Sequence, residues 1–496
     1  MKTILRMLEV LALSGLLSNE LASAQTISSP VTLSPSSAIV NVPTTIVATI
    51  LITDPLVIPS SVNLVKIDTT GRSTIVGTMH DDGLNGDAVS NDRVFSLQFS
   101  LLEASAVSLS YKASAIFRGR LTRVQSAAVA FNVQPAALLA ADGGVYHACA
   151  LTSVGGVKCV GDNENGQLGV GTTVNSPAAK DVLGLSSGVR YISTGDYHGC
   201  AITAAGGVKC WGNNRSGQLG DGTKGGFVTT PKDVLGLSSG VISIGAGNSH
   251  NCAITNAGVL KCWGINVFGM LGDGSFVDSL TPKDVIGLGA GARSVSPGFS
   301  HTCALTVAGG IKCWGASTSG QLGTGATSGN FSTPQDVFGL SSGMSAVAVS
   351  VQGSHSCALT AAGGVKCWGF NGRGQLGNGT TSASAIPMDV VGLSGGVSAI
   401  AVGGSHSCAL TAVGVVKCWG NNGNGQIGNG TQGGSILVPV DVVGLGGAVT
   451  AIAAGAGFTC ALPSVGGVKC WGINSNGRPP DATFVSSPTP QDVLGF

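Results

Sequence analysis

Residues 355–369 read HSCALTAAGGVKCWG, and this stretch recurs with small changes seven times along the 496-residue chain. Successive copies begin 51 to 54 residues apart, and each holds two cysteines ten residues apart. The pairs account for all fourteen cysteines: Cys149/Cys159, Cys200/Cys210, Cys252/Cys262, Cys303/Cys313, Cys357/Cys367, Cys408/Cys418 and Cys460/Cys470. A period near 50 predicts propeller blades or a solenoid, and seven copies favour a closed ring over residues 138–496.

The two cysteines of a copy are predicted to face each other across a β-hairpin. Pairing Cys357 with Cys367 leaves residues 361–363 as a three-residue loop, whose third position favours a left-handed conformation. That position is glycine in every copy: Gly155, Gly206, Gly258, Gly309, Gly363, Gly414 and Gly466. Directly opposed residues are close enough for a disulfide, so we predict seven local bridges. Zinc binding is the alternative, but the Cys-x(2 to 4)-Cys spacing that zinc sites prefer does not occur.

The composition supports an all-β class. The chain is 43% hydrophobic and 10% charged, with 79 glycines that follow no Gly-X-Y period. Many turn formers beside Val, Ile and Thr are typical of short strands joined by tight turns. The formal charge of +1 lacks the basic excess of nucleic-acid-binding proteins, so we expect no nucleic-acid partner. No stretch after the N-terminus reads as a membrane span. We expect a monomer.

The first 24 residues have the pattern of a cleavable signal peptide. Lys2 and Arg6 precede an apolar stretch from Met7 to Leu17, and Ala22-Ser23-Ala24 forms a small-residue cleavage site. The alternative is a disordered or buried N-terminal segment. Export would bring the cysteines to an oxidising compartment, so the expected location is extracellular, periplasmic or at the cell surface.

The repeat resembles the regulator of chromosome condensation repeat, in an alpha-tubulin suppressor-like, secreted and disulfide-rich form. The resemblance rests on His-x-Cys-Ala-Leu, on Pro-x-Asp-Val, and on Trp-Gly-x-Asn-x-x-Gly-Gln-Leu-Gly-x-Gly-Thr at Trp211–Thr223 and Trp419–Thr431, with Ile427 for Leu. It covers about residues 138–496 and implies a seven-bladed β-propeller. Val160 replaces the tryptophan of the first copy, and Phe458 replaces the histidine of the seventh.

Three polar residues recur once per copy and are interpreted as parts of the scaffold. The histidines are His147, His198, His250, His301, His355 and His406. The lysines are Lys158, Lys209, Lys261, Lys312, Lys366, Lys417 and Lys469. The aspartates are Asp181, Asp233, Asp284, Asp336, Asp389, Asp441 and Asp492. One histidine per blade cannot easily converge on one metal ion, because packed sheets lie about 10 Å apart and metal bonds are about 2 Å long. We expect these histidines to pack or hydrogen-bond within the ring.

Residues 26–135 contain no cysteine and are predicted to form a small immunoglobulin-like β-sandwich. Apolar and polar residues alternate through residues 45–52, 62–67, 93–99 and 107–116. One loop is rich in oxygen ligands: Asp81, Asp82, Asn85, Asp87 and Asp92. Hard cations such as Ca²⁺ take six to eight oxygens, so this loop is a candidate calcium site. Asp-Gly and Asn-Gly are also hairpin signals, and an ordinary turn is the alternative.

The leading functional hypothesis is a secreted or cell-surface propeller that binds a protein, or less readily a glycan, without catalysis. We find no catalytic residues, since no Ser-His-Asp or Cys-His arrangement stands apart from the repeat and no carboxylate pair appears beyond the repeated aspartates. Three alternatives remain: an extracellular enzyme inhibitor, a carbohydrate-active enzyme, and a guanine nucleotide exchange factor like the family's namesake. Clustered exposed aromatic residues on one face of the ring would favour the inhibitor. The binding residues cannot be chosen from the sequence.

Overall fold

The computed structural model describes residues 25–34, 37–39, 44–84, 89–101, 107–134, 138–144, 146–465, 467–473 and 486–496. The predicted signal peptide lies outside the described residues. The chain divides into two compact units, Met1–Ala136 and Ala137–Phe496. The described residues are almost entirely strand and turn, with one short 3-10 turn, η1 (Pro59–Ser61). None of the described helical residues forms a helix long and apolar enough to cross a membrane.

The first unit consists of two sheets that share one hydrophobic core. The smaller sheet has the order β1 (Thr32–Ser34), β3 (Thr44–Leu51), β6 (Val94–Leu101). The larger sheet has the order β2 (Ser37–Ile39), β9 (Val129–Gln134), β7 (Val107–Ala115), β4 (Asn63–Ile67), β5 (Ser73–Thr78), and β8 (Val124–Gln125) pairs with β7. Alternation in the sequence predicts β3, β4, β6 and β7 to within about two residues. It misses β5, whose first residues are exposed and leave no alternating pattern.

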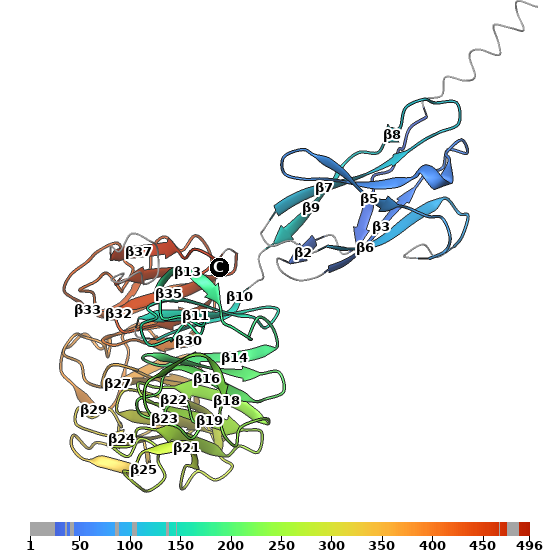
Figure 1. Ribbon diagram of the computed structural model, residues 1–496. Coiled ribbons are helices and arrows are strands. Elements are labelled where there is room, and N and C mark those ends of the chain that lie inside the picture. The colour runs from blue at the N-terminus through green and yellow to red at the C-terminus, as the bar shows by residue number, and fades with distance from the viewer. Residues whose placement is uncertain are drawn as a thin grey trace, which may run out of the picture. The chain divides into compact units, whose positions relative to one another are not determined.

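The second unit contains seven four-stranded antiparallel blades, each made of consecutive strands (Figure 1). Blade 1 comprises β10 (Leu138–Gly143), β11 (His147–Thr152), β12 (Val157–Gly161) and β13 (Ser176–Asp181). Blade 2 comprises β14 (Val189–Thr194), β15 (His198–Thr203), β16 (Val208–Asn213) and β17 (Phe227–Asp233). Blade 3 comprises β18 (Val241–Ala246), β19 (His250–Thr255), β20 (Leu260–Gly264) and β21 (Ser279–Asp284). Blade 4 comprises β22 (Ala292–Pro297), β23 (His301–Thr306), β24 (Ile311–Ala316) and β25 (Asn330–Asp336). Blade 5 comprises β26 (Met344–Val349), β27 (His355–Thr360), β28 (Val365–Gly369) and β29 (Ser384–Asp389). Blade 6 comprises β30 (Val397–Val402), β31 (His406–Thr411), β32 (Val416–Asn421) and β33 (Ser435–Asp441). Blade 7 comprises β34 (Val449–Ala454), β35 (Phe458–Pro463), β36 (Lys469–Gly472) and β37 (Ser487–Asp492). The all-β propeller is therefore confirmed.

The predicted hairpin register is also confirmed. Cys357 lies opposite Cys367, and Leu359 lies opposite Val365, which leaves residues 361–363 as the loop. Gly363 has a φ of +80°, and a Cβ there would lie 2.7 Å from the backbone nitrogen of Gly396. Glycine is required at this position for both its left-handed conformation and the close approach of the next connection.

Among the described strands of the propeller, no blade borrows one from another, because each of the seven sheets contains only consecutive strands. The ring closes where β34 of blade 7 packs against β10 of blade 1. The C-terminal segment adds a backbone hydrogen bond there, in which the Ala179 N–H donates to the Leu494 carbonyl at 2.8 Å. Side-chain packing and this short segment therefore hold the seam between the first and last blades.

Each core layer lies between two neighbouring blades. In one such layer, the disulfide cysteines Cys200 and Cys210 of blade 2 pack with Leu219 of the same blade and Trp263 of blade 3. The six tryptophans are at most 1% exposed. Burial of such large side chains is the main favourable contribution to joining one blade to the next.

Candidate functional site

All seven predicted disulfides are present, and none of the fourteen cysteines is free. The bonded pairs, one in each blade, are Cys149–Cys159, Cys200–Cys210, Cys252–Cys262, Cys303–Cys313, Cys357–Cys367, Cys408–Cys418 and Cys460–Cys470. The Cα atoms of each pair lie 4.0 to 4.1 Å apart, as expected for directly opposed residues of a hairpin. The prediction of seven local bridges is therefore confirmed in every blade.

The disulfides belong to the scaffold. All fourteen cysteine side chains are buried in the layers between blades. They are structural links, and they offer no thiol for catalysis or for metal binding.

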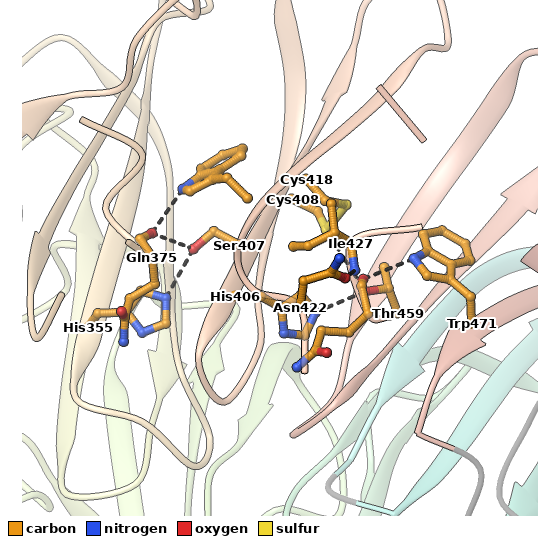
Figure 2. Close-up of a disulfide and its surroundings, with 12 residues drawn as sticks. His355, Gln375, His406, Ser407, Cys408, Cys418, Asn422, Ile427, Thr459 and Trp471 are labelled. Atoms are coloured by element: carbon orange, nitrogen blue, oxygen red, sulfur yellow. Dashed lines mark hydrogen bonds between the residues drawn. A yellow bond between two sulfur atoms is a disulfide. The ribbon is translucent and has the colours of Figure 1, made fainter. Parts of the chain in front are cut away.

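Five of the repeated histidines connect their blade to the next through a buried hydrogen-bond network, two links of which are shown in Figure 2. His406 Nε2 lies 2.8 Å from the Thr459 hydroxyl, which donates to the Gln426 carbonyl at 2.9 Å. The same carbonyl accepts from the Trp471 indole N–H at 2.9 Å. The partners of the other histidines are Asn251 for His198, Thr302 for His250, Ser356 for His301 and Ser407 for His355. Five of the six histidines thus hydrogen-bond within the ring, and His147 is buried there without such a bond.

These histidines are held neutral. Burial lowers the pKa of His250, His301 and His355 to about 3 and that of His198 and His406 to about 4. The proton of the Thr459 hydroxyl is already committed to a carbonyl, so Nε2 of His406 must carry the ring proton. Nδ1 of His406 is buried with no hydrogen-bond partner. This arrangement suits a structural linker and leaves no nitrogen placed to act as a base on a bound ligand.

The network changes at the seam between blades 7 and 1. Phe458, Ala148 and Val160 stand where most other blades have histidine, a polar partner and tryptophan, and they form one apolar cluster. The hydrogen bonds are thus replaced together by hydrophobic contacts. His147 is the other exception: both of its ring nitrogens lack a partner, because Gly199 of blade 2 has no side chain to offer.

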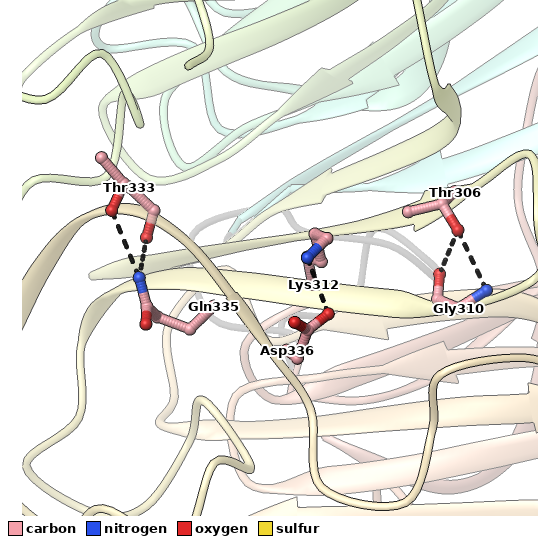
Figure 3. Close-up of polar contacts among 6 residues, drawn as sticks. All are labelled: Thr306, Gly310, Lys312, Thr333, Gln335 and Asp336. Atoms are coloured by element: carbon pink, nitrogen blue, oxygen red, sulfur yellow. Dashed lines mark hydrogen bonds and ion pairs between the residues drawn. The ribbon is translucent and has the colours of Figure 1, made fainter. Parts of the chain in front are cut away.

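The repeated lysines and aspartates form one ion pair in each blade. Lys312 Nζ lies 2.7 Å from Asp336 Oδ1 (Figure 3), and the other six pairs are 2.5 to 3.0 Å apart. The aspartate side chains are largely exposed, so each pair contributes little to stability. The interpretation of these residues as scaffold is confirmed, and they are not available as a ring of free cations.

The two ends of the ring differ. We call one end the loop face, because it carries the connections between the first and second and between the third and fourth strands of each blade. The opposite end, the hairpin face, carries the disulfide-linked hairpins. An exposed apolar residue recurs on every blade just after the last strand: Leu183, Leu235, Ile286, Phe338, Val391, Val443 and Leu494. Its sevenfold recurrence marks it as a property of the repeat.

One loop on the loop face departs from the repeat. In blade 3, Val267, Phe268, Phe276 and Val277 are 38 to 71% exposed. Phe299, which is 45% exposed, lies on the loop face of the adjacent blade 4. We call these five residues the blade 3–4 patch. Blade 2 has Arg215 and Ser216 at the positions of Val267 and Phe268, and the remaining described blades have Glu, Thr, Ser, Gly, Asn or Arg there.

The first strands of the blades surround a central channel with a cavity of about 400 Å³. The loop from Ser350 to Ser354 in blade 5 has five residues between strands, where the other blades have three. Gln352 in this loop donates to Asp196 Oδ2 at 3.2 Å, across the ring in blade 2, and Asn248 donates to the same oxygen at 2.6 Å. Burial raises the pKa of Asp196 to about 7. The contact places a polar bridge at the loop-face end of the channel.

A second cavity, of about 480 Å³, lies on the loop face between blades 1 and 2. Its lining includes Tyr146, Tyr197, Asp162, Glu164 and Arg215. Sequence reasoning did not select these residues, and it discounted carboxylates outside the repeated aspartates. The structure brings Asp162 and Glu164 into one cavity. The signal that could have found it is the replacement of the serine or glycine before the histidine position by tyrosine in two consecutive copies.

Sequence comparison identifies repeats in every blade. A model described as the regulator of chromosome condensation (RCC1) repeat matches residues 155–202, 205–254, 309–359, 362–410 and 414–462. A second RCC1 repeat model matches residues 140–167, 189–218, 241–269, 292–321, 346–375, 397–426 and 449–478. The ultraviolet-B receptor UVR8 of Arabidopsis thaliana is 30% identical over 306 residues, which cover 61% of this chain and 69% of UVR8.

The chain belongs to the RCC1 repeat family. The human E3 ubiquitin-protein ligase HERC2 is 34% identical over 298 residues, which cover 58% of this RCC1 chain but only 6% of HERC2. Human WBSCR16 has a TM-score of 0.59 at 23% identity and covers 71% of this chain and 93% of its own. Prp20p of Saccharomyces cerevisiae has a TM-score of 0.60 at 21% identity, and the match covers 70% of this chain and 87% of Prp20p. These structures share the propeller fold.

The oxygen-rich loop of this RCC1 protein lies in the first unit, outside the family match. Asp81 accepts hydrogen bonds from the backbone N–H groups of Asp92 and Arg93, and Asp82 accepts from that of Leu84. Asp92 accepts from the N–H of Val94. Asn85 and Asp87 lie outside the described residues. Among the residues that are described, no three His, Cys, Asp or Glu side chains are grouped to hold a metal ion. Calcium binding here stays a prediction.

Proposed function

We propose that this RCC1 propeller is an exported, non-catalytic protein-binding module that contacts its partner through the blade 3–4 patch. The observation that carries the proposal is the presence of three exposed aromatic residues on loops of two adjacent blades: Phe268 and Phe276 between β20 and β21, and Phe299 between β22 and β23. Exposed apolar clusters of this kind mark protein interfaces, and aromatic side chains supply much of their binding energy. The immunoglobulin-like first unit would serve as a spacer.

The family comparisons support a protein-interaction role. One solved structure shows Kap60 bound to yeast RCC1 (Prp20), and another concerns the binding properties of Prp20p to Gsp1p and histones. Those partners are not transferred to this chain. Ubiquitin ligase activity is likewise a property of HERC2 as a whole, and the match reaches 6% of that protein.

Export is supported by the disulfides. Seven local bridges persist most readily in an oxidising compartment, and the residues before Gln25 have the pattern of a signal peptide. That location argues against the exchange-factor alternative, which requires access to an intracellular GTPase. An extracellular enzyme inhibitor remains a second candidate, because the same aromatic patch could fill the active-site cleft of a target enzyme.

The location is tested first. The full-length protein is expressed in its native type of host, and its N-terminus and free thiols are determined by mass spectrometry. We expect a secreted form that begins near Gln25 and has no free cysteine. Intracellular protein with fourteen free thiols would contradict the proposal and favour the exchange-factor alternative.

The patch is tested next with Phe276→Ser combined with Val277→Ser. The matched control is Val413→Ser, which removes an exposed valine from the hairpin face. Proteins cross-linked at the surface of the producing cell or its neighbours are compared between the three forms. A partner that is retained by wild type and control and lost by the patch variant supports the proposal. Equal recovery by all three forms would show that the patch is not the interface.

A further inference from the structure

The cavity between blades 1 and 2 is built from residues that break the repeat. The residue before the histidine position is Tyr146 in blade 1 and Tyr197 in blade 2, whereas it is serine or glycine in the other five blades. The two departures from the repeat stand in adjacent blades, so they place two aromatic side chains at one point of the ring.

The two tyrosine rings meet at an angle. Their centroids are 6.0 Å apart and their planes are inclined by 61°. Both side chains are half-buried, so part of each ring faces the cavity. The backbone fixes them in place, because the Asp162 N–H donates to the Tyr146 carbonyl and the Asn213 N–H donates to the Tyr197 carbonyl, each at 2.9 Å.

The glycine that follows each tryptophan position also serves this geometry. Gly212 has a φ of +99°, and a Cβ there would lie 2.5 Å from the Tyr197 carbonyl oxygen. The tight packing holds Tyr197 against the third strand. The backbone that carries Tyr197 is therefore held in place before any ligand arrives, which lowers the entropic cost of binding.

The remaining lining supplies hydrogen-bonding groups of both kinds. Asn165 and Asn213, linked by a hydrogen bond of 3.3 Å, carry amide donors and acceptors. Asp162 and Glu164 supply acceptors, and Arg215 supplies donors. An anionic ligand would meet two carboxylates, and a cationic ligand would meet the guanidinium group. A neutral molecule with many hydroxyl groups avoids both penalties, because a hydroxyl group can donate to a carboxylate and accept from the Arg215 guanidinium.

We propose that the cavity between blades 1 and 2 is a binding site for a neutral saccharide, which stacks on Tyr146 and Tyr197 and hydrogen-bonds to the charged rim of Asp162, Glu164 and Arg215. The volume of about 480 Å³ is within the usual range of roughly 300 to 1,000 Å³ for small-ligand sites. This site is separate from the blade 3–4 patch, and its occupation does not depend on a protein partner.

The test uses the oxidised, secreted full chain and saturation-transfer difference NMR with neutral disaccharides: cellobiose, maltose, lactose, mannobiose and diacetylchitobiose. We expect at least one to bind. Tyr197→Ala should weaken that sugar at least tenfold, and Tyr197→Phe should weaken it less, because it keeps the ring. The matched control is Tyr191→Ala, which removes a tyrosine from the central channel and should leave binding unchanged. Glucuronic acid and glucosamine should bind more weakly than the neutral sugars.

Folding of each variant is checked by its free-thiol count and melting temperature. If Tyr197→Ala loses its fold, the exposed substitutions Glu164→Ala and Arg215→Ala replace it, and a joint loss of at least threefold in affinity is expected. Failure of every neutral sugar to bind would overturn the proposal. So would a bound sugar that is indifferent to these variants, or binding of tetramethylammonium or a peptide in place of the sugars. Phe276→Ser with Val277→Ser should retain sugar binding, which separates this site from the proposed protein interface.

Discussion

His406 of blade 6 and Thr459 of blade 7 are joined by a hydrogen bond of 2.8 Å between Nε2 and the hydroxyl oxygen. Because the hydroxyl proton goes to the Gln426 carbonyl, the bond has a defined direction, from imidazole to threonine. The same arrangement recurs between most neighbouring blades. The packing of tryptophan gives the ring its cohesion, and this network gives each blade a fixed register on the next.

Thr459→Val keeps the shape of the side chain and removes the acceptor. The buried Nε2–H of His406 then has no partner, which should reduce the free energy of unfolding by about 1 to 3 kcal/mol. Denaturant unfolding followed by tryptophan fluorescence measures the change. The control is Thr381→Val at an exposed position, for which we expect a change within about 0.5 kcal/mol. Equal effects of the two substitutions would show that the hydrogen bond contributes nothing specific.

The seam predicts a coupling between Phe458 and Ala148. Phe458→His alone should destabilise the ring by about 2 to 4 kcal/mol, because the imidazole is buried and Ala148 offers no hydroxyl. Ala148→Ser in the same chain should recover about 1 kcal/mol of that loss by restoring the polar pair. A double-mutant cycle from denaturant midpoints measures the coupling energy. Strict additivity of the two substitutions would be evidence against a paired exchange at the seam.

Stability should fall on acidification. His147 also has its pKa lowered to about 3 by burial, which makes six histidines that are neutral in the folded state. Their unfolded pKa is near 6.5, so the stabilisation is complete above that pH and is lost as the pH falls toward 3 to 4. At pH 5 the loss is about 2 kcal/mol for each histidine. The raised pKa of Asp196 acts in the opposite direction, but it is one group against six.

Differential scanning calorimetry from pH 7.5 to pH 5 should therefore show a decrease in the melting temperature of roughly 10 °C or more. The dependence of stability on pH near pH 5 should correspond to a net uptake of about five protons on unfolding, because the six histidines each gain one and Asp196 loses one. An uptake of one proton or fewer would mean that the histidines are not held neutral in the folded ring.

We expect the removal of any one disulfide to lower the stability of the propeller by a similar amount. Replacing Cys357 and Cys367 together with alanine should lower stability by about 2 to 3 kcal/mol in the chain-entropy view, plus a smaller cavity term. The sequence separation is ten residues in every bridge, so the pair Cys408 and Cys418 should show a similar loss. Calorimetry of both double variants provides the measurement. A loss confined to one pair would contradict the view that the bridges are equivalent supports.

The sequence by itself determined the features that depend on neighbours along the chain. Cysteines ten residues apart and a glycine at the third loop position specify a hairpin register, and that register specifies the disulfides. Seven copies specify the number of blades. Alternation of apolar residues likewise placed β3, β4, β6 and β7 of the first unit, because each strand packs one side against a core.

Only the tertiary structure decided what depends on contacts between blades. His406 and Thr459 are 53 residues apart, and Gln352 and Asp196 are 156 residues apart, so no local spacing predicts either contact. Tyr146 and Tyr197 are 51 residues apart, and only the packing of blade 1 against blade 2 brings their rings edge to face. The physical reason is that a blade is specified by local pairing, whereas the surfaces between blades exist only after folded blades pack against one another.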